Sequence, residues 1–277
     1  MGVRHLLRVL ARSRSLRFTI DAARARALAR GGVRGRPLAR LKWRGRDVFY
    51  RPATSDPLTI YQVLLRRGAK AEYYLPLSLE PKVILDIGSN IGTSVLFLHE
   101  QFPAARILAF EPHPETFRIL QTNVGSIPSV EVFNYALGAA DARISVAFDG
   151  ADFSRFMAKV EDADWCGPVK STDCEMKHAG DVMKNLGVTK VDLVKIDCEG
   201  TEYDVLTALP EEMLRQCKWI VGEMHDVSAF KLLALLASHF DLDLKKRMFV
   251  PSFRFHACNL ACVRQLEGSF DRNALQR

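Results

Sequence analysis

Residues 83–92 constrain the fold of this chain more than any other stretch. They open with an apolar run, Val-Ile-Leu, which is typical of a strand buried on both faces of a parallel sheet. Asp86 ends the run, two glycines bracket a tight turn, and a helix is expected from Thr93 onward. A strand that leads through a glycine turn into a helix is a nucleotide-binding arrangement, because free backbone N–H groups point into the site. The alternative is an ordinary strand-to-helix turn.

The residue between the two glycines indicates which nucleotide binds. A pyrophosphate-binding fingerprint has a second glycine two residues after the first, so that phosphate can approach the backbone. Here Asn90 occupies that position. S-adenosylmethionine carries no phosphate, so it tolerates a side chain there, whereas a nicotinamide dinucleotide is disfavoured. We expect the turn to hold S-adenosylmethionine through Asp86, Gly88, Ser89, Asn90 and Gly92.

A second short strand, Arg106–Phe110, ends at an acidic residue. Glu111 lies 19 residues after Gly92, close to the spacing of about 20 at which a carboxylate meets the ribose hydroxyls of a nucleotide. A carboxylate suits that task because it accepts hydrogen bonds from both hydroxyls. We therefore assign Glu111 and the adjoining Pro112 to the cofactor site, with a helix-capping role for Glu111 as the alternative.

A third strand, Val130–Phe133, should bring the following loop near the adenine, which makes Asn134 and Ala136 candidate contacts. About forty residues then show alternating apolar positions and polar breaks. This pattern predicts a hairpin insertion, and such an insertion beside the site would suit a substrate lid.

The stretch Val191–Gly200 predicts a strand that carries Lys195 and Asp197 on one face, because alternate residues share a side. Charged residues in an apolar strand are costly to bury unless they are paired. The carboxyl ends of central strands are where doubly wound sheets bind ligands, so these two residues and Glu199 are candidate catalytic groups. An internal ion pair is the alternative interpretation.

The stretch Trp219–Asp226 repeats this design, with Glu223 and His225 on one face of a fifth strand. A single histidine at a strand end is often structural. Here it should neighbour Asp197 and Glu199 across adjacent strands. A catalytic role and a structural role are therefore equally supported.

The charge of the chain is unevenly distributed. Residues 1–46 hold fourteen Lys and Arg against one acid, Asp21, whereas the remainder holds 25 against 31. This basic segment is compatible with an amphipathic helix on anionic lipid or nucleic acid, with an organellar transit peptide, or with a solvated extension. No aromatic interleaving accompanies the arginines, which disfavours nucleic acid as a partner. The six cysteines form no zinc-type cluster and indicate a reducing compartment, such as the cytoplasm.

The remaining patterns predict how the domain is completed. We expect a hairpin over Leu41–Tyr50, a helix to about Arg67 with Asp56 as its N-cap and Pro57 at its first position, a helix over Ser228–Phe240, and a closing antiparallel pair that ends in an apolar strand, Asn259–Val263. The fold class is α/β. The predicted division is a basic extension (1–46), a lead-in hairpin and helix (47–80), a core domain (81–265) and a tail (266–277).

Three motifs together resemble the FkbM-type family of S-adenosylmethionine-dependent methyltransferases: Leu85–Gly92, Phe110–Pro114 and Val194–Tyr203. Glu223–His225 and Asn259–Ala261 agree as well, and the resemblance covers about residues 80–265. The Lys-Ile-Asp-x-Glu-Gly-x-Glu run within the third motif is the most particular to the family. The resemblance implies a Rossmann-like seven-stranded class I methyltransferase sheet and, usually, methylation of a hydroxyl on a sugar, glycan or secondary metabolite.

This function requires a group that removes the hydroxyl proton. His225 is the preferred base because its ordinary pKa of about 6.5 suits proton acceptance at neutral pH, and Asp197 is the second choice. No metal is required, although the acids could instead hold a divalent cation. Two other functions stay open: a nicotinamide-dependent oxidoreductase, and a non-catalytic nucleotide-binding protein anchored through its basic arm. The acceptor and the oligomeric state are not determined by the sequence.

Overall fold

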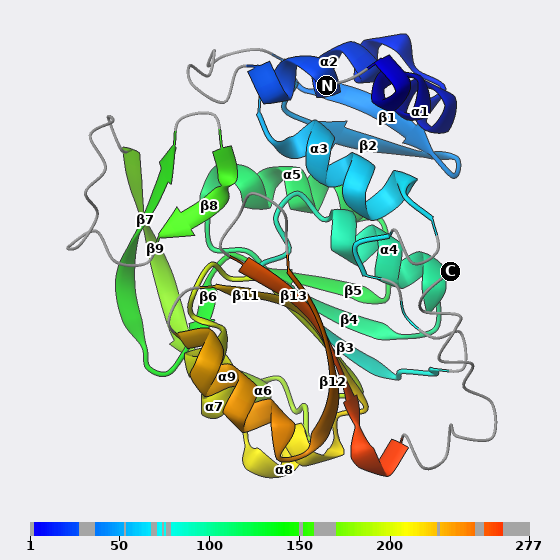
Figure 1. The fold of residues 1–277 in the computed structure, drawn as a ribbon. Helices are drawn as coiled ribbons and strands as arrows, with labels where there is room; N and C mark the ends of the chain where they lie inside the picture. The colour runs from blue at the N-terminus through cyan, green and yellow to red at the C-terminus, as the bar shows by residue number, and fades with distance from the viewer. Residues whose placement is uncertain are drawn as a thin grey trace.

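The structure is a computed structural model (Figure 1). It describes residues 3–27, 37–52, 54–67, 71–73, 75, 79–149, 152–157, 170–225, 228–246 and 252–262. The predicted tail, 266–277, lies outside these residues, and the predicted division of the chain into domains remains a prediction.

A seven-stranded sheet forms the centre of the molecule, in the order β12-β13-β11-β10-β3-β4-β5. Neighbouring strands from β11 to β5 are parallel, and β13 is antiparallel to both of its neighbours. This confirms the predicted fold class. The strands are β3 (Val83–Ile87), β4 (Arg106–Phe110), β5 (Val130–Phe133), β10 (Leu193–Ile196), β11 (Trp219–His225), β12 (Phe240–Lys246) and β13 (Ser252–Asn259).

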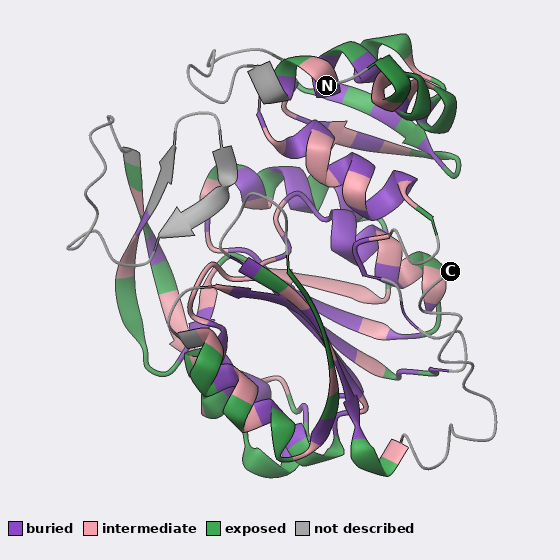
Figure 2. Ribbon diagram, viewed as in Figure 1, coloured by how far each residue is buried: buried purple, intermediate pink, exposed green. Residues whose placement is uncertain are grey.

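Helices cover both faces of the sheet because successive strand residues point to opposite sides. Ile84 packs in a core with helices α4 (Thr93–Gln101) and α5 (Pro114–Val124), whereas its neighbour Leu85 packs in a second core on the other face. Figure 2 shows the central strands largely buried. The second core includes residues of α6 (Ala179–Asn185), α7 (Glu202–Ala208), α8 (Glu211–Gln216) and α9 (Ser228–Ala237).

The predicted hairpin insertion forms a separate four-stranded sheet at one side of the molecule (Figure 1). Its strands are β6 (Ala136–Gly138), β7 (Ala142–Asp149), β8 (Asp152–Met157) and β9 (Lys170–His178), in the order β6-β9-β7-β8. Because β6 follows directly from the loop after β5, this small sheet starts at the carboxyl edge of the main sheet.

The basic segment is a packed part of the fold in its described residues, not a solvated extension. It forms α1 (Val3–Ser13), α2 (Leu16–Ala27) and β1 (Ala39–Trp43), and β1 pairs with β2 (Arg46–Tyr50) in the predicted hairpin. Phe18 of α2 is fully buried and meets the Tyr50 ring edge-on at 5.5 Å. The Tyr50 hydroxyl donates to Asp21 at 2.9 Å. Apolar residues between the arginines therefore anchor this segment.

The helix expected from Asp56 to about Arg67 is divided and starts differently. Helix α3 spans Asp56–Ile60 and continues as a wider helical turn, η1 (Tyr61–Leu65), with Ser55 as the N-cap. The carboxylate of Asp56 is buried and binds the Arg51 guanidinium and backbone N–H at 2.8 Å, so it is not available to cap the helix. A buried ion pair has replaced the predicted cap.

The apolar stretch Asn259–Val263 was predicted as the final strand, and this is wrong. Strand β13 ends at Asn259, and residues 260–262 are helical. The Asn259 side chain ends the strand: its Nδ2 donates to the carbonyls of Arg215 and Cys217, and its Oδ1 accepts from Ala261 N. A side chain bonded both to the segment before β11 and to Ala261 beyond the strand end thus overrides the apolar pattern.

Gly222 in β11 offers a stability test of this sheet. A Cβ at this position would lie 1.8 Å from the carbonyl oxygen of Ile196 in β10. We expect Gly222→Ala to lower the free energy of unfolding by about 3 kcal/mol, because the clash is with backbone that cannot move alone. Gly45→Ala is the control, since a Cβ there meets nothing within 4 Å and only its positive φ costs about 1 kcal/mol. Equal losses in urea unfolding would contradict this reading.

No helix in the described part of the chain is both long and apolar enough to cross a membrane. The described cysteines are all free thiols, and Cys166 lies outside the described residues.

Candidate active site

The glycine turn after β3 packs directly on the end of β10. Gly88 and Gly92 have φ values of 77° and 87°, and Asn90 also has a positive φ of 49°. A Cβ on Gly88 would lie 2.0 Å from the carbonyl oxygen of Asp197, so only glycine fits there. The sequence motif therefore has two physical causes, left-handed backbone and close approach of a second strand.

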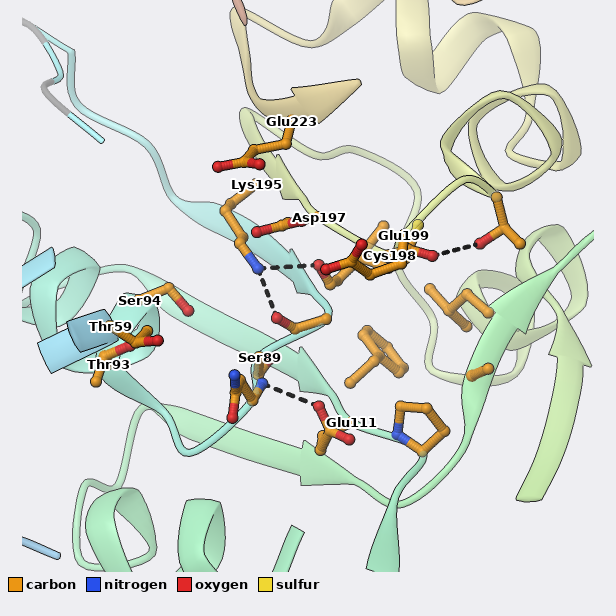
Figure 3. Close-up of a pocket in the computed structure, with 18 of the residues that line it drawn as sticks. Thr59, Ser89, Thr93, Ser94, Glu111, Lys195, Asp197, Cys198, Glu199 and Glu223 are labelled. Carbon is orange, nitrogen blue, oxygen red and sulfur yellow. Dashed lines mark hydrogen bonds between the residues drawn. The ribbon is translucent and has the colours of Figure 1, made fainter. Parts of the chain in front are cut away.

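Glu111 closes the other side of the turn. Its carboxylate accepts from the backbone N–H of Asn90 at 3.0 Å and of His113 at 2.9 Å. Figure 3 shows Glu111 beside the turn that carries Ser89. Burial raises the pKa of Glu111 to about 7, against the opposing effect of these two N–H donors. The Asn90 Oδ1 atom is buried and has no hydrogen-bond partner within the described residues. A ligand with hydroxyl donors, such as a ribose, would satisfy both side chains.

Lys195 holds the turn from below. Its ammonium donates to the carbonyl oxygens of Ile87 at 3.1 Å and Gly88 at 2.6 Å, and it lies 3.3 Å from Asp86 Oδ1. Burial alone would lower the pKa of Lys195, but Asp86 and Asp197 raise it above its ordinary value. These contacts use the three donors of an ammonium group. Lys195 and Asp86 therefore act as positioning residues for the turn.

Asp197, Glu199 and Glu223 form an acidic wall on the far side of the cavity (Figure 3). Burial and then Glu223 raise the pKa of Asp197 to about 6, and burial and then Asp197 raise that of Glu199 to about 9. The Tyr73 hydroxyl lies 3.4 Å from Asp197 Oδ2 and donates to it. The wall thus combines an ionised Asp197 at neutral pH with a neighbouring group that holds its proton.

His225 is enclosed by carboxylates behind this wall. Its Nδ1 lies 2.9 Å from Glu202 Oε1, and its Nε2 lies 3.5 Å from Glu199 and 3.6 Å from Glu223. Burial alone would lower its pKa, but the bonds to Glu202 and Glu223 raise the pKa to about 11. An imidazole that already carries its second proton cannot accept another. This geometry argues against His225 as the general base and favours Asp197.

The same groups have spacings that suit a cation. One ligand atom each from Asp197, Glu223 and His225 lies within 4.8 Å of the others. In this structure the histidine is instead paired with carboxylates on both of its ring nitrogens.

Most of the predicted site residues line one cavity. Apolar residues of the small sheet line the same cavity. Asn134 is one exception, because its Nδ2 donates to the carbonyls of Glu111 and Pro112 at 2.9 Å and so braces the loop. Asp86, Gly92 and His225 are likewise not part of the described lining. The predicted residues that line the cavity are Gly88, Ser89, Asn90, Glu111, Pro112, Ala136, Lys195, Asp197, Glu199 and Glu223.

Several lining residues carry no sequence signal. Thr59 and Gln62 come from α3 and η1, and Glu72 from the connection to β3. No motif surrounds them, and only the fold brings this early segment over the carboxyl edge of the sheet. Ile144, Val146 and Met176 come from the insertion and give the cavity its apolar side.

The chain is similar in sequence to known proteins, two of which are named as methyltransferases. The chain is 29% identical over 178 residues to the AMB antimetabolite synthetase AmbE of Pseudomonas aeruginosa, covering 52% of this chain but 8% of that protein. It is 28% identical over 185 residues to the 31-O-demethyl-FK506 methyltransferase FkbM of Streptomyces tacrolimicus, covering 57% and 71% of the two chains. It is 24% identical over 189 residues to the 2-O-methyltransferase NoeI of Sinorhizobium fredii, covering 63% and 73%.

A protein-family match covers a longer stretch of the chain than the short sequence motifs do. Residues 86–248 match the methyltransferase FkbM domain, and this range holds the glycine turn, Glu111 and the acidic wall. The match supports the expected use of S-adenosylmethionine and gives no support to the nicotinamide-dependent alternative. With more than half of its length matched, the chain belongs to the family of methyltransferase FkbM domains.

Proposed function

We propose that this chain transfers the methyl group of S-adenosylmethionine to a hydroxyl of a sugar, glycan or secondary metabolite. The observation that carries the proposal is the single cavity in which the glycine turn and Glu111 face the acidic wall. The names of two relatives, a 31-O-demethyl-FK506 methyltransferase and a 2-O-methyltransferase, describe methylation at oxygen and support the same chemistry here.

The residues of the cavity fit the cofactor. Asn90 Oδ1 and the Glu111 carboxylate offer acceptors to the ribose hydroxyls, and the apolar residues of the small sheet offer a surface to the adenine. The ionised Asp197 places a negative charge on the cavity wall, which suits a positively charged sulfur. When bound, S-adenosylmethionine would supply an electrophilic methyl group on a sulfonium, whose sulfur would be left as a neutral thioether.

The protein then has two tasks, to position the acceptor oxygen and to remove its proton. Asp197 would take the proton of the acceptor hydroxyl, whose oxygen would receive the methyl group. Tyr73, which donates to Asp197, orients the carboxylate, and the negative charge of Glu223 raises its pKa. Lys195 keeps the glycine turn at the correct distance from this base, because it bonds to the turn from strand β10, which Asp197 directly follows.

The carboxylates of the cavity indicate the class of acceptor, and the cysteines indicate the cellular compartment. Carboxylates that line a cavity offer hydrogen-bond acceptors to the hydroxyls of a polyol, so we propose a small-molecule or glycan acceptor and not nucleic acid. The free thiols of the described cysteines support a reducing compartment, such as the cytoplasm.

The pH dependence of catalysis should report Asp197. Its pKa is raised to about 6, and a base works only when deprotonated, so kcat/KM should fall as the pH drops through about 6. The positive charge of His225 lowers the pKa of Asp197, so His225→Gln should move this acidic limb to higher pH while some activity remains. A limb that disappears in His225→Gln would identify the histidine as the base instead.

The proposal is tested first by cofactor binding and then by turnover. Isothermal titration should show binding of S-adenosylmethionine and of its demethylated product, and no binding of NAD. Transfer of a labelled methyl group to a panel of sugars and hydroxylated metabolites then identifies the acceptor class. Binding of NAD alone would overturn the proposal. Cofactor binding without transfer to any panel member, hydroxyl or amine, would favour the non-catalytic alternative.

A further inference from the structure

Helices α1 and α2 present large aliphatic side chains to solvent. The exposed fractions are 73% for Val3 and 60% for Leu7 in α1, and 66% for Leu16 and 41% for Ile20 in α2. Each pair is spaced by four residues, so each forms a stripe along one side of its helix. Figure 2 shows exposed residues along the outer side of both helices.

A stripe of arginines runs beside each apolar stripe. The spacing of four residues also relates Arg4, Arg8 and Arg12, so they share one side of α1. The lone acid of the two helices, Asp21, is buried and bonded to Tyr50, which leaves the described exposed surface of α1 and α2 without a carboxylate. The exposed arginines of this surface are Arg4, Arg8, Arg12, Arg14, Arg17 and Arg24.

The inner sides of the helices are already committed to the protein. Val9 and Phe18 are fully buried in the core that α4 and α5 share. The helices therefore cannot turn to hide Leu7 or Leu16 without losing this packing. Their outward face stays aliphatic and basic in the folded chain.

From this combination we infer that the outward face of α1 and α2 docks on an anionic lipid bilayer. Aliphatic side chains enter the interface between headgroups and acyl chains, and arginines beside them meet lipid phosphates. Single-stranded nucleic acid is a poorer match, because it stacks its bases on exposed aromatic side chains, and the aromatic residue of α2, Phe18, is buried. This inference is independent of methyl transfer.

The docking face lies close to the wall of the cavity. The His5 ring of α1 contacts the Tyr61 ring of η1 at 5.1 Å between centroids, and Val63 of η1 lines the cavity. One layer of helix thus separates the proposed lipid surface from the cavity wall.

The test is co-sedimentation of the full chain with vesicles of pure phosphatidylcholine and with vesicles containing 30% phosphatidylserine, at about 0.1 and 0.5 M salt. We expect binding to the anionic vesicles at least tenfold tighter than to the neutral ones, and weaker at the higher salt. Calorimetry with S-adenosylmethionine on the same samples shows whether the cavity is intact, so failure of docking and failure of the proposed function are told apart.

Two sets of variants separate the contributions. Leu7→Ser with Leu16→Ser removes aliphatic area, and Arg4→Gln, Arg8→Gln and Arg12→Gln remove charge. Each set should weaken binding to anionic vesicles at least tenfold and leave the melting temperature unchanged, because these side chains are exposed. Matched controls far from the face are Phe230→Ser in α9, 77% exposed, and Lys184→Gln with Lys245→Gln and Lys246→Gln, which should bind as the wild type does.

Three results would overturn the inference. One is equal binding to neutral and anionic vesicles, or none to either. Another is binding to anionic vesicles that the leucine substitutions leave unchanged, which would mean that the face binds polyanions through charge alone. The third is binding of single-stranded RNA that competes with vesicles and is unaffected by the leucine variants.

Discussion

Asp197→Asn is expected to lower kcat by about 10²- to 10⁴-fold, the usual contribution of a positioned general base. Asn has the size of Asp but cannot take the hydroxyl proton. The Asp197 side chain lies on the far wall from Glu111, so we expect the affinity for S-adenosylmethionine to fall much less than kcat, by the contribution of one negative charge near the sulfonium. Steady-state kinetics with the identified acceptor, together with calorimetry, measure the two quantities separately.

The matched control is Asp204→Asn, an exposed acid in α7 just beyond the acidic wall. It should leave both kcat and cofactor affinity unchanged. If Asp197→Asn retained wild-type kcat while His225→Gln abolished turnover, the assignment of the base would be reversed. If Asp197→Asn instead lost cofactor binding in proportion to its activity, Asp197 would belong to the cofactor site.

Glu111→Ala should weaken the binding of S-adenosylmethionine by about 100-fold or more. The substitution removes a carboxylate that we expect to accept from two ribose hydroxyls, and hydrogen bonds to a charged group contribute about 1.5–3 kcal/mol each. It also leaves the N–H groups of Asn90 and His113 without the partner they have in the folded chain. Isothermal titration measures the change in Kd directly.

Glu115→Ala provides the comparison, because Glu115 is an exposed acid in the first turn of α5, only four residues away. It should bind the cofactor as the wild type does. A folded Glu111→Ala protein with unchanged affinity would mean that the carboxylate only braces the loop between β4 and α5. Urea unfolding of the same variant separates this outcome from a loss of fold.

The central sheet and its cofactor turn could be predicted because local patterns specify them. The apolar runs at β3, β4, β10 and β11 are typical of buried strands, and Gly88 and Gly92 occupy backbone conformations that other residues adopt at a cost. The acids at the strand ends were placed together by one rule, that carboxyl ends of parallel strands meet at the same edge. Lys195, Asp197, Glu199 and Glu223 do line one cavity, as this rule requires.

The role of each charged side chain was not predictable in the same way. The sequence gives no reason to expect a shifted pKa for His225. Only the fold brings Glu202 to 2.9 Å from its Nδ1, and the pKa is raised to about 11. Lys195 was a candidate for catalysis until the turn placed two carbonyl oxygens and Asp86 around its ammonium. Electrostatic effects depend on distances between groups far apart along the chain, which local patterns do not contain.

The sequence by itself determined the core strands of the sheet, the glycine turn, the acidic residue after β4 and the family, because each is specified by residues close together in the chain. The tertiary structure decided the pKa values of the acids at the strand ends, how Asn259 ends the last strand, and that the arginine-rich segment is packed through Phe18 and Tyr50 with its aliphatic side outward. Those properties depend on burial and on contacts between distant segments, which exist only when the chain is folded.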